Sequence, residues 1–209
     1  MKQDAYRLYA NFYDPLVEPT ARILRDIGLK IFSPRENIAI LDVGCGTGTQ
    51  LALYQRPGCR LVGIDKSPTM LGIAKRKLGA AAELDLGDAT QMPFGAATFD
   101  LVTLVFVLHE MSPELRPAVL EECQRVLKPD GRIMLIDYQP GPYPLFMGQV
   151  WHLVITLMEI SAGGAHYRNY RKFIAAGGLE GLLAGQQLCV QKRWVSGRGT
   201  TAIYLVGAG

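Results

Sequence analysis

Short apolar runs alternate with amphipathic runs through the middle of this chain. An apolar run between turn residues predicts a buried strand, and an amphipathic run predicts a crossover helix. Strands are predicted at residues 38–43, 60–64, 82–86, 99–108 and 132–137, and helices at residues 47–54, 67–78 and from residue 112 to an LKPDG turn. Ser67 is placed to cap the second of these helices, with Pro68 at its first position. This alternation predicts a parallel sheet with helices on both faces.

The end of the chain predicts a change of direction in the sheet. Residues 187–194 and 200–206 both read as strands, and Gly197 and Gly199 lie between them. A short connection containing glycine is typical of an antiparallel hairpin. We therefore expect an α/β fold with seven strands, mostly parallel, in which the last strand runs antiparallel.

Two segments interrupt the alternation and suggest how the chain is organised. We expect a single domain with an N-terminal helical lid segment at residues 1–35, a core at 36–138, a lid insertion at 139–178 and C-terminal strands at 179–209. The insertion contains the apolar run 145–160, which is short for a membrane span and carries His152 and Glu159. An apolar helix of this kind is buried or covers something apolar. A core helix, a lid, a dimer contact and a membrane-facing surface all remain open.

The segment LDVGCGTG, residues 41–48, follows the first predicted strand. Its glycines Gly44, Gly46 and Gly48 permit a tight turn and the close approach of a ligand, which binds outside the carboxyl ends of such strands. Their spacing is GxGxG, whereas the dinucleotide fingerprint is GxGxxG and holds a pyrophosphate. Asp42, just before them, suits a cationic ligand better than a diphosphate, or else orients the loop.

Carboxylates also mark the ends of the next two strands. Asp65 ends the second strand, where a carboxylate can accept both hydroxyls of an adenosine ribose. Asp88 follows the third strand, where its side chain or the Ala89 amide can meet an adenine edge. A turn-forming Asp is the simpler explanation of Asp88 taken alone. Together, three successive strand ends predict a site for an adenosine-containing ligand.

In order and spacing, five segments resemble the successive motifs of class I S-adenosylmethionine-dependent methyltransferases: LDVGCGTG, VGIDKSPTML, GDATQMPF, FDLVTLVFVLHEM and RVLKPDGRIMLIDY. The resemblance covers about residues 38–138. It is nearest to the group that includes the ubiquinone and menaquinone biosynthesis C-methyltransferases and many small-molecule methyltransferases. It implies a Rossmann-like seven-stranded fold, S-adenosylmethionine as cofactor and S-adenosylhomocysteine as product.

The resemblance also assigns roles to residues of this chain. It places Gly44 and Gly46 against the methionine half of the cofactor and Asp65 on the ribose. It places Lys66, Met70, Asp88 and Ala89 at the adenine. It also places Val105 and Phe106, at the end of the fourth strand, near the cofactor. The full set of candidate cofactor residues is Asp42, Gly44, Cys45, Gly46, Gly48, Asp65, Lys66, Met70, Asp88, Ala89, Val105 and Phe106.

The methyl acceptor leaves fewer marks in the sequence. The methyl group of a sulfonium is already activated, so the protein mainly positions and desolvates the reactants, and a base is needed only if the acceptor loses a proton. His109, after the fourth strand, is the candidate base because imidazole titrates near neutral pH. Its alternative role is structural.

The N-terminal aromatic residues and a basic run are further candidates. Tyr6, Tyr9 and Tyr13 recur at helical spacing and either close over the site or pack on the core. Tyr13 is the candidate catalytic residue among them, because a Tyr near the N-terminus often touches the cofactor in the resembling family. The run HYRNYRK, residues 166–172, suits either an anionic head group or the solvated face of a helix.

Composition limits the remaining possibilities. The 209 residues are 49% hydrophobic and 20% charged, which is typical of a globular protein, and the net charge of +3 does not call for nucleic acid. The four cysteines show neither a CxxC pair nor zinc-ligand spacing, so we expect reduced thiols and no metal. The first residues lack a signal-peptide pattern, which favours a cytoplasmic protein without a transmembrane span, with peripheral membrane contact left open.

We therefore predict methyl transfer from S-adenosylmethionine to a small, apolar acceptor at C, O or N, by a monomer or homodimer with no nucleic-acid partner. There are three alternative functions. They are a protein that binds the cofactor without transfer, a phospholipid head-group N-methyltransferase and a nucleotide-cofactor oxidoreductase. The glycine spacing and Asp88 disfavour the oxidoreductase.

Overall fold

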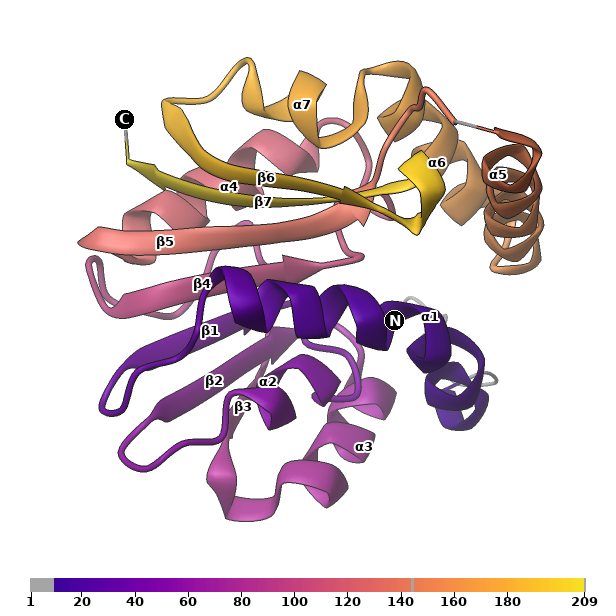
Figure 1. Cartoon of the computed structure of the whole chain (residues 1–209). Helices are drawn as coiled ribbons and strands as arrows, with labels where there is room; N and C mark the ends of the chain where they lie inside the picture. The colour runs from indigo at the N-terminus through magenta and orange to yellow at the C-terminus, as the bar shows by residue number, and fades with distance from the viewer. Residues whose placement is uncertain (1–9, 144, 209) are drawn as a thin grey trace.

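The computed structural model describes the backbone of residues 10–143 and 145–208, and the side chains of residues 21–143, 146–196 and 198–207. Within these residues one sheet has the strand order β3-β2-β1-β4-β5-β7-β6 (Figure 1). Its strands are β1 (Ala39–Val43), β2 (Arg60–Asp65), β3 (Glu83–Leu86), β4 (Phe99–Val105), β5 (Leu127–Tyr138), β6 (Leu188–Ser196) and β7 (Thr201–Ala208).

The pairing confirms the predicted change of strand direction. Strand β1 pairs in parallel with β2 and with β4, β2 pairs in parallel with β3, and β4 with β5. Strand β7 pairs antiparallel with both β5 and β6. Because β1, β2, β3 and β4 run in the same direction, their carboxyl ends meet at one edge of the sheet, where such folds bind ligands.

Helices cover both faces of the sheet, as the alternation predicts (Figure 1). The core on one face includes side chains of α1, α2 and α3, such as Leu24, Leu51 and Leu78. The core on the other face includes side chains of α4, α6 and α7, such as Leu120 and Phe173. The helices are α1 (Ala10–Ile31), α2 (Thr49–Leu53), α3 (Pro68–Leu78), α4 (Leu115–Val126), α5 (Leu145–Ser161), α6 (Gly164–Ala175) and α7 (Gly178–Leu183), with 3₁₀ turns at Gly79–Ala81 (η1) and Gly197–Gly199 (η2).

Local sequence signals explain several boundaries. The Ser67 hydroxyl accepts a hydrogen bond from the Met70 amide at 3.1 Å, with Pro68 at the first turn, so the predicted cap is confirmed. Strand β4 ends at Val105, not at residue 108 as predicted, because Phe106 adopts a left-handed conformation with φ of 56° that takes the chain out of the sheet.

Two other predicted boundaries were also wrong. Helix α4 begins at Leu115 rather than at Ser112. The LKPDG segment, predicted as a turn, belongs to β5, where Leu127 pairs with Phe99 before the register shifts so that Leu101 pairs with Arg132. The turn-forming residues thus form an irregularity within the strand pair rather than a separate loop.

The segments predicted as lids lie in different places. Residues of α1 from Ala21 onward pack on the sheet, and a side chain added at Gly28 would meet the Met134 sulfur at 2.9 Å. Helix α5 lies beyond the strand ends, beside α6 and η2 (Figure 1). A lid function therefore stays a prediction for both segments. Within the described part of the chain, every helix is too short or too polar to cross a membrane.

Candidate active site

A cleft of about 350 Å³ lies at the carboxyl ends of the first four strands. This volume falls within the range of roughly 300–1,000 Å³ that is usual for small-molecule sites. The cleft is lined by Gly44, Gly46, Ile64, Asp65, Lys66, Met70, Leu86, Gly87, Asp88, Ala89, Thr90, Val105, Phe106, Val107, Glu110, Met111, Leu115 and Val119. Nine of the twelve predicted cofactor residues line this cleft, so the structure brings most of them together, and their contact with a cofactor stays a prediction.

The Asp65 carboxylate joins the ends of the first two strands. Its Oδ2 accepts a hydrogen bond from the Gly46 amide at 2.8 Å, and its Oδ1 accepts one from the Ser67 amide at 2.8 Å. The amides of Gly44 and Cys45 donate to the Ile64 carbonyl at 2.8 and 3.2 Å. Asp65 therefore fixes the glycine loop while its half-buried carboxylate also lines the cleft.

Two glycines of the loop are needed for different reasons. Gly44 has a φ of +68°, and a side-chain carbon added there would lie 2.5 Å from Val107, so neither the backbone nor the space admits another residue. Gly46 has a φ of +53° and faces open space. The loop backbone at Gly46 is consequently accessible to a ligand in the cleft.

Asp88 forms the opposite rim of the cleft. Its Oδ1 accepts hydrogen bonds from the Thr90 amide at 2.9 Å and the Thr90 hydroxyl at 2.8 Å. These bonds hold the pKa of Asp88 below its usual value, so the exposed carboxylate stays ionised near neutral pH. Asp88 is both the turn-forming residue and a cleft residue, so the two interpretations do not exclude each other.

Three predicted cofactor residues lie behind the cleft surface. Cys45 is 6% exposed and packs against Gly63. A side-chain carbon added at Gly63 would lie 2.7 Å from the Cys45 sulfur. Gly48 caps α2 and lies against Leu78 of α3. Asp42 is 2% exposed, and its Oδ1 accepts a hydrogen bond from the Thr103 hydroxyl at 2.6 Å. None of the three is among the cleft-lining residues, so their contact with a cofactor stays a prediction.

The environment of Asp42 is unusual for a carboxyl group. Burial raises its pKa to about 7, although the Thr103 hydrogen bond and the positive charge of Arg25 act in the opposite direction, and the Asp65 charge raises it further. Arg25 itself is buried and donates to Gln50 at 3.0 Å. The alternative role of Asp42, orienting the loop from below, agrees with this position.

His109 is buried beneath the cleft rather than on its surface. Its Nδ1 lies 2.7 Å from Asp137 Oδ1, and Asp137 Oδ2 accepts hydrogen bonds from the amides of Leu108 at 3.0 Å and His109 at 3.2 Å. Burial alone would lower the pKa of His109, but the carboxylates of Asp137, Glu159 and Glu110 raise it to about 9. A near-neutral pKa was the reason to choose His109 as the candidate base, and its pKa is higher than that. A role as general base therefore stays a prediction that rests on position alone.

Arg116 is a buried residue beside the cleft segment that the sequence did not single out. It is 3% exposed, and its guanidinium donates to the carbonyls of Leu108 at 2.9 Å, Met111 at 2.8 Å and Asn169 at 2.8 Å. The Asn169 side chain in turn donates to the Glu110 carbonyl at 2.7 Å. These bonds fasten α6 to the segment that follows β4. The sequence gives no sign of this role, because the acceptor that joins Arg116 to α6, the Asn169 carbonyl, lies 53 residues further along the chain.

The remaining candidates divide between exposed and undescribed residues. In the basic run, Arg168, Arg171 and Lys172 are exposed, as the solvated-helix interpretation predicts. Tyr6 and Tyr9 lie outside the described residues. Tyr13 falls within α1, but its side chain lies outside the described part of the structure. Its contact with a cofactor stays a prediction.

Together, the fold and the cleft define a class of protein. The mostly parallel sheet with an antiparallel β7 brings the glycine loop after β1 and the carboxylates at the ends of β2 and β3 together around one cleft, as expected of a site for an adenosine-containing molecule. A family model described as a methyltransferase domain matches residues 40–131.

Relatives and solved structures agree with this class. An uncharacterised methyltransferase of Synechocystis is 35% identical over 163 residues, which is 69% of this chain and 76% of that protein. The demethylmenaquinone methyltransferase of Thermotoga maritima is 34% identical over 127 residues, 60% of this chain and 54% of that protein. The crystal structure of an S-adenosylmethionine-dependent methyltransferase from Aquifex aeolicus has a TM-score of 0.62 at 21% identity, covering 87% of this chain and 88% of that one.

The chain belongs to the class I S-adenosylmethionine-dependent methyltransferases. Its cofactor is accordingly S-adenosylmethionine. The match spans only about half the length of the Thermotoga enzyme.

The cleft residues fit this cofactor. Gly46 leaves open space at the loop backbone, and Asp65 provides a half-buried acceptor for ribose hydroxyls beside it. Leu86 and Leu115, which line the cleft, are 63% and 46% exposed, and such exposed apolar side chains suit the faces of an adenine ring. Polar groups at the loop and apolar walls around them match the mixed character of an adenosyl ligand.

Proposed function

We propose that this enzyme methylates a small, apolar acceptor, and that the acceptor binds between the segment after β4 and helices α5 and α6. The observation that carries this proposal is that the cleft and an apolar surface on α5 lie at the same end of the sheet. The cleft reaches Val107, Glu110 and Met111, which lie in the segment that Arg116 fastens to α6.

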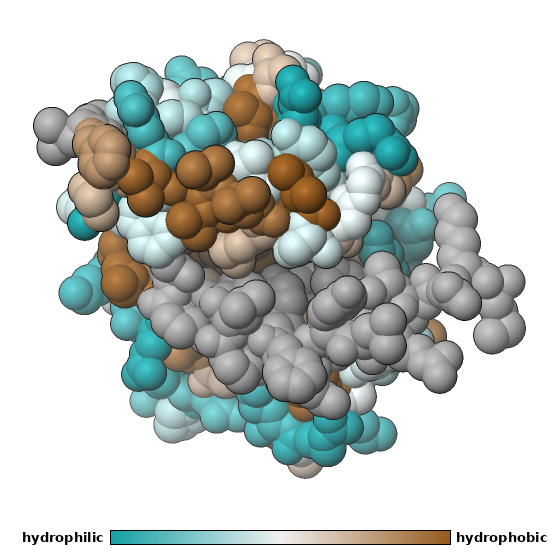
Figure 2. Space-filling model, turned by 90° about the vertical axis from the view of Figure 1, so that its right-hand side faces the viewer, coloured by the Kyte–Doolittle hydropathy of each residue, from teal (hydrophilic) through white to brown (hydrophobic). Residues whose placement is uncertain are grey.

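Helix α5 supplies the apolar surface. Several of its large side chains are exposed, with exposed fractions of 46–77%: Phe146, Met147, Leu153, Leu157 and Ile160. Figure 2 faces the end of the molecule where α5 lies and shows hydrophobic residues gathered there. Exposed apolar groups in one patch are typical of a surface that meets an apolar molecule or a membrane. This patch supports an apolar acceptor.

The chain's own residues would act mainly by binding and excluding water. When bound, S-adenosylmethionine supplies a methyl group that is already activated on a sulfonium sulfur. Gly44, Gly46 and Asp65 would hold it, and the apolar residues Val105, Val107 and Met111 would keep water from the reacting end of the cleft. If the acceptor must lose a proton, Glu110 is better placed than buried His109, because Glu110 lines the cleft.

A phospholipid head-group acceptor has less support. Arg168, Arg171 and Lys172 are the basic residues that would hold a phosphate in that case. All three are exposed, and none is among the residues that line the cleft. The family name of the Thermotoga relative, a demethylmenaquinone methyltransferase, is more consistent with an apolar ring as acceptor.

The test is transfer of a labelled methyl group. The full chain would be incubated with S-adenosylmethionine carrying a labelled methyl group and with demethylated quinones, small phenols or phosphatidylethanolamine vesicles. We expect label in a quinone or phenol and stoichiometric formation of S-adenosylhomocysteine. Label found only in phosphatidylethanolamine would establish the head-group alternative. Cofactor binding without transfer to any acceptor of the panel would contradict the proposal and favour a protein that only binds the cofactor.

A further inference from the structure

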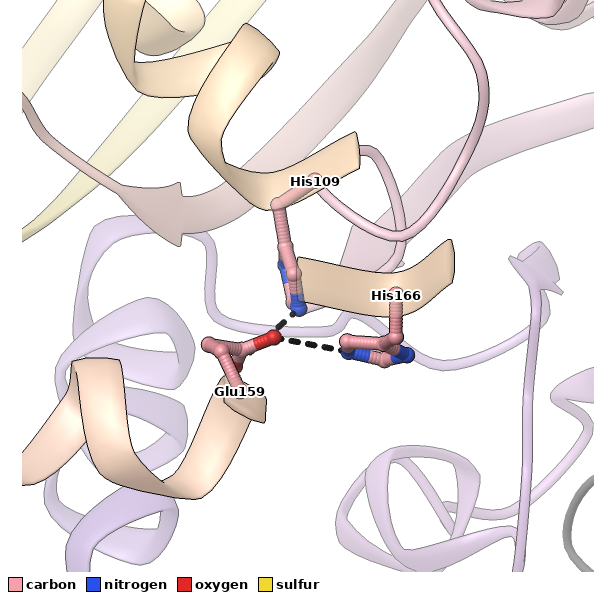
Figure 3. A group of neighbouring side chains, drawn as sticks. All are labelled: His109, Glu159 and His166. Carbon is pink, nitrogen blue, oxygen red and sulfur yellow. Dashed lines mark ion pairs between the residues drawn. The ribbon is translucent and has the colours of Figure 1, made fainter. Parts of the chain in front are cut away.

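Three side chains from three separate segments converge beside the cleft. His109 comes from the segment after β4, Glu159 from the last turns of α5 and His166 from the first turn of α6, and all three point toward one another (Figure 3). His109 Nε2 lies 3.6 Å from Glu159 Oε1, and His166 Nε2 lies 2.7 Å from Glu159 Oε2. One donor atom from each residue can be chosen so that all three lie within 4.8 Å of one another.

We propose that His109, Glu159 and His166 form a binding site for a divalent transition-metal ion, with Zn²⁺ as the best match. Two imidazoles and one carboxylate are a ligand set that Zn²⁺ and Fe²⁺ accept, whereas Mg²⁺ and Ca²⁺ prefer oxygen ligands alone. Two ligands of one tetrahedral Zn²⁺ ion lie roughly 3.3 Å apart, from Zn–N and Zn–O bonds of about 2.0–2.1 Å. Small side-chain rotations would bring the observed contacts to that spacing.

The support around His109 is the second observation. Asp137 holds His109 Nδ1 at 2.7 Å and is itself fixed by the amides of Leu108, His109 and Tyr138. This leaves Nε2 as the ring atom directed at Glu159 (Figure 3). Metal-binding histidines almost always place the other ring nitrogen on a carboxylate or carbonyl in this way, because that contact fixes the tautomer and the ring orientation.

The site is mostly enclosed, and Glu110 lies near enough to be considered as a fourth ligand. His109 and Glu159 are 2% and 5% exposed, while the His166 side chain is 18% exposed, so an ion would enter from the His166 side. Glu110 Oε1 lies 3.9 Å from His166 Nε2 and also lines the cofactor cleft. A fourth position filled by Glu110, water or an acceptor atom would complete a tetrahedron. The ion would tie α5 and α6 to the segment after β4.

The three proposed ligands are far apart in the sequence, which is why the sequence alone predicts no metal. The spacing of His109, Glu159 and His166 matches no short zinc motif, because Glu159 lies 50 residues after His109 and on a different element. The only signal in the sequence is that the chain has three histidines, and two of them meet here. The third, His152, lies elsewhere on α5, stacked on Tyr143 at 4.4 Å between ring centroids.

The test uses the full chain, stripped with a chelator and then titrated with Zn²⁺ alone. We expect one tightly bound Zn²⁺ per chain by elemental analysis and a melting temperature that rises with Zn²⁺. Co²⁺ added in place of Zn²⁺ should give the visible absorption bands of a tetrahedral site with nitrogen and oxygen ligands. This spectrum needs no variant, so it holds even if a substitution disturbs folding.

Variants separate this site from other histidines. Glu159→Gln and His166→Gln should each weaken Zn²⁺ binding at least tenfold and abolish the Co²⁺ bands. His152→Gln removes a histidine from the same helix as Glu159 and should change neither. Binding of S-adenosylhomocysteine should persist in all three variants, which would show that they are folded. Because none of these measurements uses a methyl acceptor, the metal site is tested independently of the proposed function. Substoichiometric Zn²⁺ in the native chain, or equal Zn²⁺ affinity in Glu159→Gln, would show that the cluster is only a set of ion pairs.

Discussion

The buried carboxyl group of Asp42 makes a quantitative prediction about stability and pH. Asp42 is 2% exposed, and its folded pKa is about 7 compared with 3.8 for the ordinary side chain. Between these two values the folded protein holds a proton that the unfolded chain has lost. The stability from this group is therefore complete below pH 3.8 and is lost as the pH rises through 7.

The magnitude follows from the size of the shift. Each pKa unit corresponds to about 1.4 kcal/mol, so raising the pH from 5 to 8 should lower the free energy of unfolding by about 3 kcal/mol through Asp42 alone. The substitution Asp42→Asn removes the titration. Its amide oxygen can still accept the hydrogen bond from the Thr103 hydroxyl, which lies 2.6 Å from Asp42 Oδ1. Any packing cost of the new amide group is independent of pH.

The assay is urea unfolding of both proteins at several values between pH 5 and 8. Other titrating groups are present in both chains, so they cancel in the difference between the two unfolding free energies. We expect that Asp42→Asn gains about 3 kcal/mol relative to the native chain across this range. A difference that does not change with pH would show that Asp42 is ionised throughout, and the account of its burial would be wrong.

Two further substitutions test how the cleft is built. Gly44→Ala should weaken S-adenosylhomocysteine binding at least tenfold in calorimetry, because the φ of +68° costs about 1–2 kcal/mol for alanine and the new methyl group meets Val107. Adding Val107→Ala should recover only part of the loss, and full recovery would argue against backbone strain. Arg116→Met should lower the free energy of unfolding by about 3 kcal/mol or more, because three carbonyls lose their donor. The exposed Arg168→Met serves as control and should stay within about 0.5 kcal/mol of the native chain, so an equal effect of both would count against the role of Arg116.

The sequence predicts the scaffold well because the scaffold depends on local patterns. The chain pattern predicted all seven strands, and the apolar runs are clearest for β1, β2 and β4, since a strand buried on both faces has little room for polar side chains. Asp65 and Asp88 were located because parallel strands bring their carboxyl ends to one edge. Phe106 was misplaced in a strand because an apolar side chain carries no sign of its left-handed backbone.

The side chains around His109 and Arg116 are held by contacts between distant parts of the chain, and no local sequence pattern predicts such contacts. Asp137 meets His109 across 28 residues, and Arg116 meets Asn169 across 53. Asp42 and Asp65 are both acidic residues on strands, yet one faces the core and the other the cleft. The pKa of His109 reverses the expectation from its residue type, because three carboxylates outweigh the effect of burial.

The most direct test of the cofactor site is calorimetric titration with S-adenosylhomocysteine. The native chain should bind one molecule with an affinity in the micromolar range, about −8 kcal/mol. Asp65→Asn should weaken binding roughly ten- to a hundredfold, because hydrogen bonds to a charged carboxylate contribute about 1.5–3 kcal/mol. Asp130→Asn, which removes an exposed carboxylate outside the cleft, should bind like the native chain. Absence of binding heat and of any thermal shift in the native chain, or unchanged binding by Asp65→Asn, would contradict the assignment of this cleft.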